Sequence, residues 1–554
     1  MKKIFGLLLI TILSLSLASC KDSESLSSTT KNNNSSSSVN GDDKFDGLDR
    51  NTTASLDIMM WAGDDTYHED IGSMSWDASE IYGLNVAAIY AVAKEFKKEF
   101  PNISINLYAK KDDLNGGDLT WQQTIEQFRE QHGKYPDLWA TDNVVREISS
   151  GLVLDLSTFS DSYYYKKIIP SLLESSNVMG FQGALPAYSI PWGVYVNKQL
   201  AEDNNINVPD PDWTIDEYTR FTNSAKPADG YYGSLDTSMR MLREAVVEKQ
   251  LVNGLPDGKF IDVTTDTFKD GIKLLQKQSE KSIYSLMGLG EISNEEWNAL
   301  GGYSYQIFAN GNLLTLDSDP WMMGFANGTG ANRVTSTDWD IYPCPSFEED
   351  DNFIGSVLDP LVMYNYYGED GVASPVEEKK AKIAFAFAGY WLCDNDSWAA
   401  RAAQQYTLDA TGTLSSALND SFPIVSGSDF DTQMADWYST PNHEPFSDAK
   451  KFPGFATVVD YYNNNKIYSV SDKAYPLTYV DDSGNLIECL DYLSQYANPD
   501  YVGEVTIDDD AWTNTYLAGL SIYNDSMNES FTAAFAKVKA DLIKYYGWTE
   551  ADFK

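Results

Sequence analysis

Residues 55–65 read SLDIMMWAGDD, and together with the segment that follows they predict the fold class. Apolar residues alternate along this stretch up to Trp61, which is typical of a β-strand. Residues 83–101 then carry apolar residues at helical spacing and end in proline, and residues 102–109 alternate again. Strand, helix and strand in this order indicate a β–α–β unit of a mostly parallel sheet.

The same alternation of strands and helices continues along the chain. Residues 120–157 predict a helix, a short strand at 138–140 and a second helix, and residues 192–196 predict a strand that leads into another helix. Thr214 and Glu217 have the spacing of a capping box, which marks a helix start. The expected fold class is therefore α/β, and ligands of such sheets bind beyond the carboxyl ends of the strands.

The N-terminus has the pattern of an export signal followed by a linker. Residues 1–19 combine two lysines with a short apolar run, as secretion signals do. The following Cys20, preceded by Leu-Ala-Ser, resembles the lipidation site of bacterial lipoproteins, which implies a lipid on its thiol. Residues 20–55 have almost no apolar side chains, so we expect a lipidated disordered tether with a mean span of about 30 Å.

Composition narrows the possible functions. A chain of 554 residues is too long for one core, so two or more lobes are expected. The net charge of −42 argues against a nucleic-acid partner, because phosphates need Lys and Arg. With three His in the chain we expect no metal and no cofactor. Cys344, Cys393 and Cys489 are an odd number, so at most one disulfide can form, and buried free thiols are expected.

Five stretches, in order, resemble the extracellular solute-binding proteins of bacterial carbohydrate ABC importers (family 1, maltose-binding-protein-like). The strongest is GALPAYSIPWGVYVNKQLAEDNNINVPDPDWTIDEYTRF at residues 183–221, in which a lobe-crossing strand precedes a later helix start. Each motif is weak alone, but five in sequence behind a lipidation motif are specific. The other four lie at 55–65 with 93–107, at 135–157, at 307–347 and at 379–430.

The resemblance implies a two-lobed periplasmic-binding-protein type II fold with three hinge crossings and a ligand cleft between the lobes. By motif position, the crossings are expected near 180–188, 354–359 and 422–427. The implied division assigns residues 56–182 and 357–424 to lobe 1, and residues 183–356 and 425–554 to lobe 2.

A sugar site needs aromatic rings for the C–H faces of the sugar, and carboxylates or amides for its hydroxyls. Trp321 stands where the family places its stacking tryptophan, and Asp319 precedes it as a hydroxyl contact or a turn cap. By the same resemblance we expect ligand contacts from seven further residues, several of which could equally be packing residues: Trp61, Asp64, Trp139, Asp142, Tyr188, Trp192 and Asp359.

The implied function is that of the extracellular substrate-binding component of an ABC transporter, not an enzyme. It would capture a sugar, here expected to be an oligosaccharide, and deliver it to the permease subunits. The protein would be a monomer at the cell surface or in the periplasm, held to the membrane by the lipid on Cys20.

Three other functions stay open on the sequence alone. A secreted glycoside hydrolase needs two suitably spaced carboxylates, and 82 acidic residues always provide some pair. A non-transport glycan-binding lipoprotein is a second possibility, although the strand signals speak against the all-helical architecture of that group. Peptide or metal binding is the third.

Overall fold

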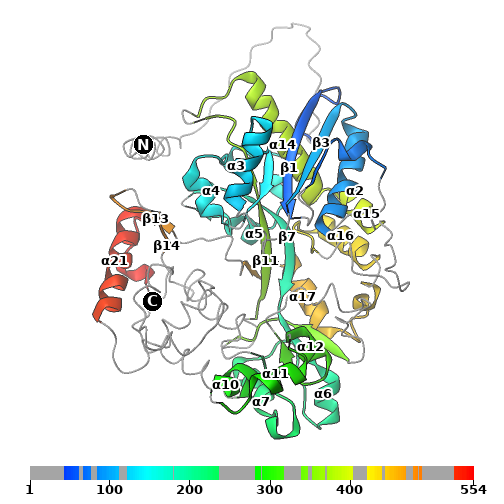
Figure 1. Ribbon diagram of the computed structural model, residues 1–554, viewed down its shortest axis with the longest axis vertical. Helices are drawn as coiled ribbons and strands as arrows, with labels where there is room; N and C mark the ends of the chain where they lie inside the picture. Colours follow the sequence, from blue (N-terminus) through cyan, green and yellow to red (C-terminus); the bar gives the residue numbers. More distant parts are fainter. Residues whose placement is uncertain are drawn as a thin grey trace, which may run out of the picture.

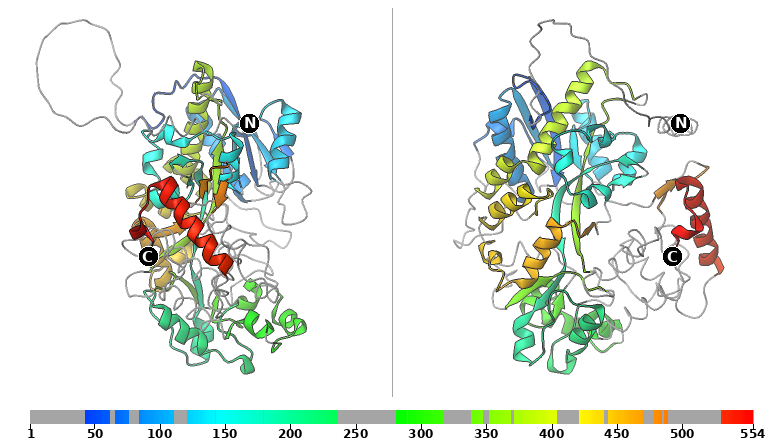
Figure 2. Two further views of the ribbon diagram at one scale, coloured as in Figure 1. Left: turned by 90° about the vertical axis from the view of Figure 1, so that its left-hand side faces the viewer. Right: turned by 180° about the vertical axis from the view of Figure 1, so that it is seen from behind.

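The structure is a computed structural model with two α/β lobes, which long paired strands connect (Figure 1). Strand β7 (Leu185–Trp192) pairs antiparallel with β11 (Ile354–Met363), and Figure 2 shows the blue strands of lobe 1 and the green helices of lobe 2 at opposite ends of the molecule. The structure describes residues 43–61, 66–75, 84–110, 121–141, 143–178, 180–235, 281–288, 290–302, 304–316, 338–346, 352–368, 371–403, 421–439, 443–469, 478–483, 486–488 and 529–553.

Lobe 1 is built on a sheet with the order β12-β11-β4-β1-β3-β2, and β7 pairs on β11. The strands not yet introduced are β1 (Ala54–Trp61), β2 (Thr66–His68), β3 (Ile103–Lys110), β4 (Leu138–Ala140) and β12 (Ile467–Ser469). Strand β1 runs parallel to both β3 and β4. Helix α2 (Leu84–Glu99) lies between β1 and β3 in the chain, after the short β2 and η1, and the two strands are parallel neighbours, which confirms the predicted β–α–β unit.

Several helices cover this sheet, and their ends follow local sequence signals. Helix α14 (Pro375–Cys393) begins with a capping box at Ser374 and has proline in its first turn, which suits a helix start. Asp394 ends it and caps the next helix, α15 (Asn395–Ala402). The other elements here are α3 (Trp121–His132), α4 (Val144–Ser150), α5 (Pro170–Glu174), η1 (Ile71–Ser73), η4 (Leu156–Phe159), η5 (Tyr165–Lys167) and the hairpin of β5 (Asn177–Val178) and β6 (Phe181–Gln182).

Lobe 2 contains a three-stranded sheet of β8 (Val194–Asn197), β9 (Thr315–Leu316) and β10 (Trp339–Tyr342), with β8 in the middle. The capping box predicted at Thr214 and Glu217 is confirmed at the start of α7 (Ile215–Asn223). Further elements are α6 (Lys198–Asp203), η6 (Pro227–Asp229), α10 (Ile283–Gly288), α11 (Asn294–Leu300) and α12 (Ser304–Ala309).

The C-terminal part contributes to both lobes. Helix α17 (Pro453–Asn463) packs on β10, and the side chain of Asp340 in β10 accepts hydrogen bonds from the backbone N–H groups of Gly454 and Phe455 at its start (2.8 and 3.0 Å). The remaining elements are α16 (Ser428–Ser439), η8 (Glu444–Ser447), β13 (Thr478–Val480), β14 (Leu486–Glu488), α21 (Glu529–Tyr546) and η9 (Glu550–Asp552).

The structure differs from two predicted boundaries. Helix α16, predicted in lobe 2, packs on α15 of lobe 1, and Lys167 bonds to Asp429 (2.6 Å). Residues 43–55, predicted as part of the tether, instead pack on lobe 1, where Phe45 is buried among aromatic side chains. Among the described helices, none is long and apolar enough to cross a bilayer. Cys344 and Cys393 are buried cysteines outside any disulfide, as predicted, and Cys489 lies outside the described residues.

An aromatic cluster fills the space where α16, η8 and α17 meet. His443 is 1% exposed and its ring stacks on Trp437 (centroids 3.8 Å apart), whose carbonyl contacts the Nδ1 atom (3.2 Å). Trp437 also stacks on Phe455 of α17. Burial lowers the pKa of His443 to about 3, because the surrounding rings cannot solvate an imidazolium.

We expect His443 to make the protein sensitive to acid. Its folded pKa lies below the ordinary value of 6.5, so its contribution to stability is fully present above pH 6.5 and is lost as the pH falls toward 3. The loss approaches about 1.4 kcal/mol per pH unit. The free energy of unfolding, measured with urea at pH 7 and at pH 5, should change less between these pH values in His443→Asn than in the parent. The reason is that asparagine keeps a hydrogen-bond donor but does not titrate. Equal differences in both proteins would contradict this assignment.

Candidate functional site

The edge of the lobe 1 sheet that faces lobe 2 follows from the strand register. Strand β4 is antiparallel to β11, with Ala140 opposite Leu361, so its carboxyl end points along β11 toward lobe 2. Strands β1 and β3 are parallel to β4 and end in the same direction, at Trp61 and Lys110, which are direct neighbours. We call these strand ends the lobe 1 edge.

Two predicted residues lie together just beyond this edge, on the strands that cross between the lobes. Tyr188 of β7 and Asp359 of β11 are register partners, and both are 8% exposed. The register shifts between Asp359 and Pro360, whose carbonyl accepts a hydrogen bond from the backbone N–H of Thr141 (3.0 Å). This irregularity places the Tyr188–Asp359 pair directly after the end of β4. Trp192 follows at the end of β7 and is mostly buried.

The loop after β4 is held by a buried polar network. The hydroxyl of Thr141 donates to Glu147 (3.0 Å), and Arg146 bonds to the same carboxylate (2.8 Å). Asn143 caps α4 by accepting a hydrogen bond from the Arg146 backbone N–H (2.8 Å). Thr141 and Asn143, on either side of position 142, are therefore both held by hydrogen bonds to α4.

Trp139 does not lie where the resemblance implied. Its indole is fully buried in the hydrophobic core, on a strand between β1 and β11, with Met59 and Val362 as register partners. An enclosed ring has no face to offer to a sugar, so we remove Trp139 from the proposed contacts. Trp61 is at the lobe 1 edge, as predicted. Five predicted functional residues lie outside the described residues: Cys20, Asp64, Asp142, Asp319 and Trp321.

The structure adds residues that the sequence analysis did not select. Lys110 is a buried lysine at the carboxyl end of β3, beside Trp61. The rule that ligands bind beyond strand ends could have identified it, since it directly follows an alternating apolar stretch. A buried hydroxyl cluster links both crossing strands to α17: Ser189 lies 2.7 Å from Ser356 and 3.1 Å from the hydroxyl of Tyr462.

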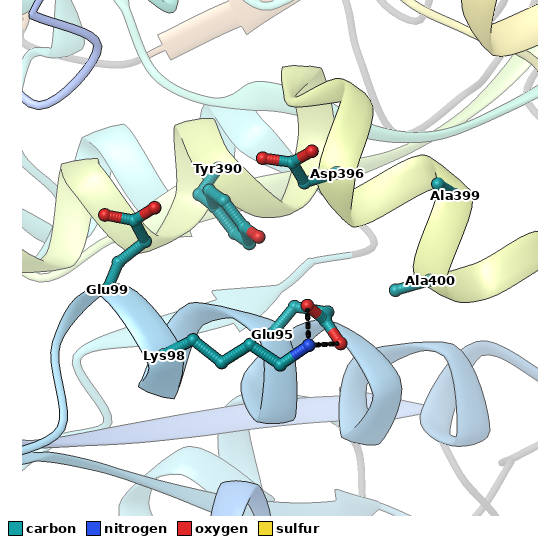
Figure 3. A pocket seen from close by; sticks show the side chains of 7 residues that line it. All are labelled: Glu95, Lys98, Glu99, Tyr390, Asp396, Ala399 and Ala400. Carbon is teal, nitrogen blue, oxygen red and sulfur yellow. Dashed lines mark hydrogen bonds and ion pairs between the residues drawn. The ribbon is translucent and has the colours of Figure 1, made fainter.

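Three surface cavities, of about 340, 370 and 530 Å³, are lined by none of the predicted contact residues. The first lies between α2 and the α14–α15 corner, where Glu95, Glu99 and Asp396 surround Tyr390 (Figure 3). Within the described ranges, His, Cys, Asp and Glu form no group of three that could hold a metal ion. The lobe 1 edge with the Tyr188–Asp359 pair therefore remains the candidate site.

Two α/β lobes, joined by paired crossing strands with aromatic and acidic side chains between them, define the class of two-lobed binding proteins. The family model of bacterial extracellular solute-binding proteins matches residues 91–423, which is more than half of the chain. The chain therefore belongs to this family.

Solved structures share the fold at low sequence identity. A family 1 extracellular solute-binding protein from Bifidobacterium longum subsp. infantis is 16% identical, covers 88% of this chain and 99% of its own, and has a TM-score of 0.50. A sugar transporter from Rhizobium etli, in an open conformation, is 18% identical, with the same coverage and TM-score. A cyclic alpha-maltosyl-1,6-maltose binding protein from Arthrobacter globiformis is 14% identical, covers 86% and 100%, and has a TM-score of 0.50. No curated protein sequence matches the chain.

Proposed function

We propose that this protein is the extracellular substrate-binding component of an ABC importer and that it captures a sugar, of oligosaccharide size, between its lobes. The observation that carries the proposal is the Tyr188–Asp359 pair, which sets an aromatic and an acidic residue opposite each other in the register of the strands that join the lobes. A sugar requires both kinds of group. Structurally similar proteins from Rhizobium etli and Arthrobacter globiformis are a sugar transporter and an oligosaccharide-binding protein, which supports a carbohydrate ligand.

The proposed site combines described and undescribed parts of the chain. On the crossing strands, Tyr188 supplies aromatic surface and Asp359 accepts hydrogen bonds from hydroxyls, with Trp192 at the end of β7 and Trp61 at the end of β1. Trp321 remains the proposed stacking residue of lobe 2, because a ring at the end of a strand can cover a sugar face. Asp64, Asp142 and Asp319 complete the proposed hydroxyl contacts.

Capture follows from the two-lobed architecture. A ligand that contacts both lobes stabilises the closed arrangement and shifts the population toward it by its differential affinity for the two states. The crossing strands β7 and β11 carry part of the proposed site, so bending near Gly193 or at the start of β11 would close the lobes around it. The closed form would then dock on the permease subunits, with the protein held at the cell surface or in the periplasm by a lipid on Cys20.

A panel of neutral mono- and oligosaccharides, with peptides as controls, should identify the ligand by thermal shift. A sugar at 100 times its dissociation constant is expected to add about 2.7 kcal/mol to the free energy of unfolding. The Trp321→Ala and Tyr188→Ala variants should each bind about tenfold more weakly or worse, since one tenfold step is about 1.4 kcal/mol of lost contact. Val376→Ala, at an exposed position of α14, is the matched control and should bind normally.

Two outcomes of this panel would contradict the proposal. If the bound oligosaccharide is recovered cleaved, the protein is a glycoside hydrolase, and the acidic residues of the site become candidates for its acid and base. If peptides and not sugars shift the unfolding temperature, the ligand class is wrong although the fold is right. Recovery of an intact sugar, with weaker binding in both site variants, supports the proposal.

A further inference from the structure

Residues 43–52 precede the first strand and bind to the surface of lobe 1; we call them the N-terminal clasp. The ring of Phe45 is 3% exposed and inserts among aromatic side chains from several elements. Its centroid lies 4.9 Å from that of Phe100, 5.9 Å from Tyr390, 6.0 Å from Tyr164 and 6.1 Å from Phe96. Aromatic burial of this kind is among the strongest contacts a short segment can make.

Charged side chains of the clasp are paired with lobe 1 on either side of this ring. The Nζ atom of Lys44 lies 3.2 Å from both Asp394 and Asp396, and over the ring of Tyr390. The Nε atom of Arg50 lies 3.4 Å from Glu99. The lobe surface here is acidic and aromatic, and the clasp presents the complementary cations to it.

The clasp is also held in shape by its own turn. The carboxylate of Asp43 accepts hydrogen bonds from the backbone N–H groups of Phe45 (3.1 Å) and Gly47 (2.8 Å). Asp46 and Gly47 have positive φ values of 49° and 79°, which residues of these types tolerate best. The turn therefore presents Phe45 to the lobe without further ordering, which lowers the entropy cost of binding.

The clasp binds across a seam between two parts of lobe 1. Figure 3 shows Glu99 of α2 and Tyr390 and Asp396 of the α14–α15 corner around one cavity, and all three contact clasp residues. The seam is near the amino ends of β1 and β3, since the clasp leads directly into β1, and Phe100, which Phe45 contacts, lies just before β3. The lobe 1 edge lies at the other end of these eight-residue strands, about 26 Å away.

We propose that this seam is a binding site for the chain's own N-terminal segment, which fixes the point where the tether leaves lobe 1. If the lipid anchor on Cys20 is as proposed above, the tether then runs from residue 20 to residue 42. Its mean span is about 24 Å, rather than about 30 Å, as expected for a tether to residue 55. The membrane attachment then acts on lobe 1, at the end opposite the lobe 1 edge.

Brief trypsin digestion of residues 21–554, the chain after the predicted signal and anchor cysteine, tests the clasp, because its own Lys44 and Arg50 are trypsin sites. Mass spectrometry should show that cleavage after both residues is at least about tenfold slower than cleavage after Lys31 of the predicted tether. The reason is that trypsin cuts the clasp only in the fraction of molecules in which it is released from the lobe. Phe45→Ala should raise cleavage after Lys44 and Arg50 at least about tenfold. Phe45→Leu, which keeps an apolar side chain, should stay near the parent.

Either of two results would overturn the proposal. Cleavage of the parent after Lys44 and Arg50 as fast as after Lys31 would mean that the segment is not held. Faster cleavage throughout the body in Phe45→Ala, with α2 losing hydrogen-exchange protection, would mean that Phe45 is a core residue of the lobe and not part of a releasable clasp. Sugar affinity is measured separately and should not change in either variant, so a failure of the proposed function remains distinguishable.

Discussion

Replacing Asp137 with alanine is expected to lower the free energy of unfolding by about 3–5 kcal/mol, the usual cost of breaking a buried, hydrogen-bonded ion pair. Its buried carboxylate joins three parts of lobe 1. It accepts hydrogen bonds from the backbone N–H of Asp57 in β1 (2.8 Å) and from the hydroxyl of Tyr366 (2.7 Å), and it pairs with Lys380 of α14 (2.8 Å). Alanine would leave the first two donors buried without an acceptor.

Urea unfolding, with the midpoint and slope fitted together, measures this effect. Asp137→Asn keeps one acceptor oxygen but removes the charge and replaces the other oxygen with an NH2 group, so we expect a smaller loss than in Asp137→Ala. Asp161→Ala is the surface control, because that carboxylate is fully exposed and should change stability by no more than about 0.5 kcal/mol. If Asp137→Ala and Asp161→Ala have the same urea midpoint of unfolding, the network around Asp137 does not stabilise lobe 1.

Gly193→Ala should damage both stability and solute capture. Gly193 joins β7 to β8, and a Cβ atom there would lie 2.3 Å from the backbone carbonyl oxygen of Tyr342 and 2.9 Å from Ile354. A backbone carbonyl cannot rotate away as a side chain can, so the strands at the crossing must separate. Overpacking of this kind lowers the free energy of unfolding by about 1–3 kcal/mol, and we expect a loss near the upper end of this range for Gly193→Ala.

The matched control is Gly371→Ala, an exposed position with φ of +68° where an added Cβ would meet nothing within 4 Å. It carries only the strain of a left-handed alanine, about 1 kcal/mol. Urea unfolding compares the two, and titration with the sugar found in the panel should show weaker binding for Gly193→Ala only. Equal stability losses in both variants would show that the crossing tolerates a side chain.

The β–α–β unit could be predicted from sequence, because its signal is local. Hydrophobic periodicity over residues 55–109 repeats at the spacing of each element, and the capping box at Thr214 lies within four residues. The order of five such local patterns was enough to indicate the family, which the match over residues 91–423 confirms. Boundaries that depend on distant packing were less accurate, as α16 shows.

The candidate site was only partly predictable, because the function of a side chain depends on which strand lies beside it. Trp139 and Tyr188 are both aromatic residues on predicted strands. The register of β4 between β1 and β11 encloses Trp139, while the irregularity at Asp359 sets Tyr188 beside a carboxylate just past the end of β4. The sequence alone does not encode these neighbours in any local pattern.

The sequence by itself determined the order of strands and helices and, through them, the two-lobed class, since periodic apolar residues act on their own segment. Only the tertiary structure decided that Asp137 meets Tyr366 and that Lys44 meets Asp394, pairs separated by 229 and 350 residues. Such contacts form because the sheet brings distant segments to one place, where a buried charge or an aromatic ring requires a partner. The contacts of the clasp and of the buried network in lobe 1 therefore depend on tertiary packing, and no local sequence pattern predicted them.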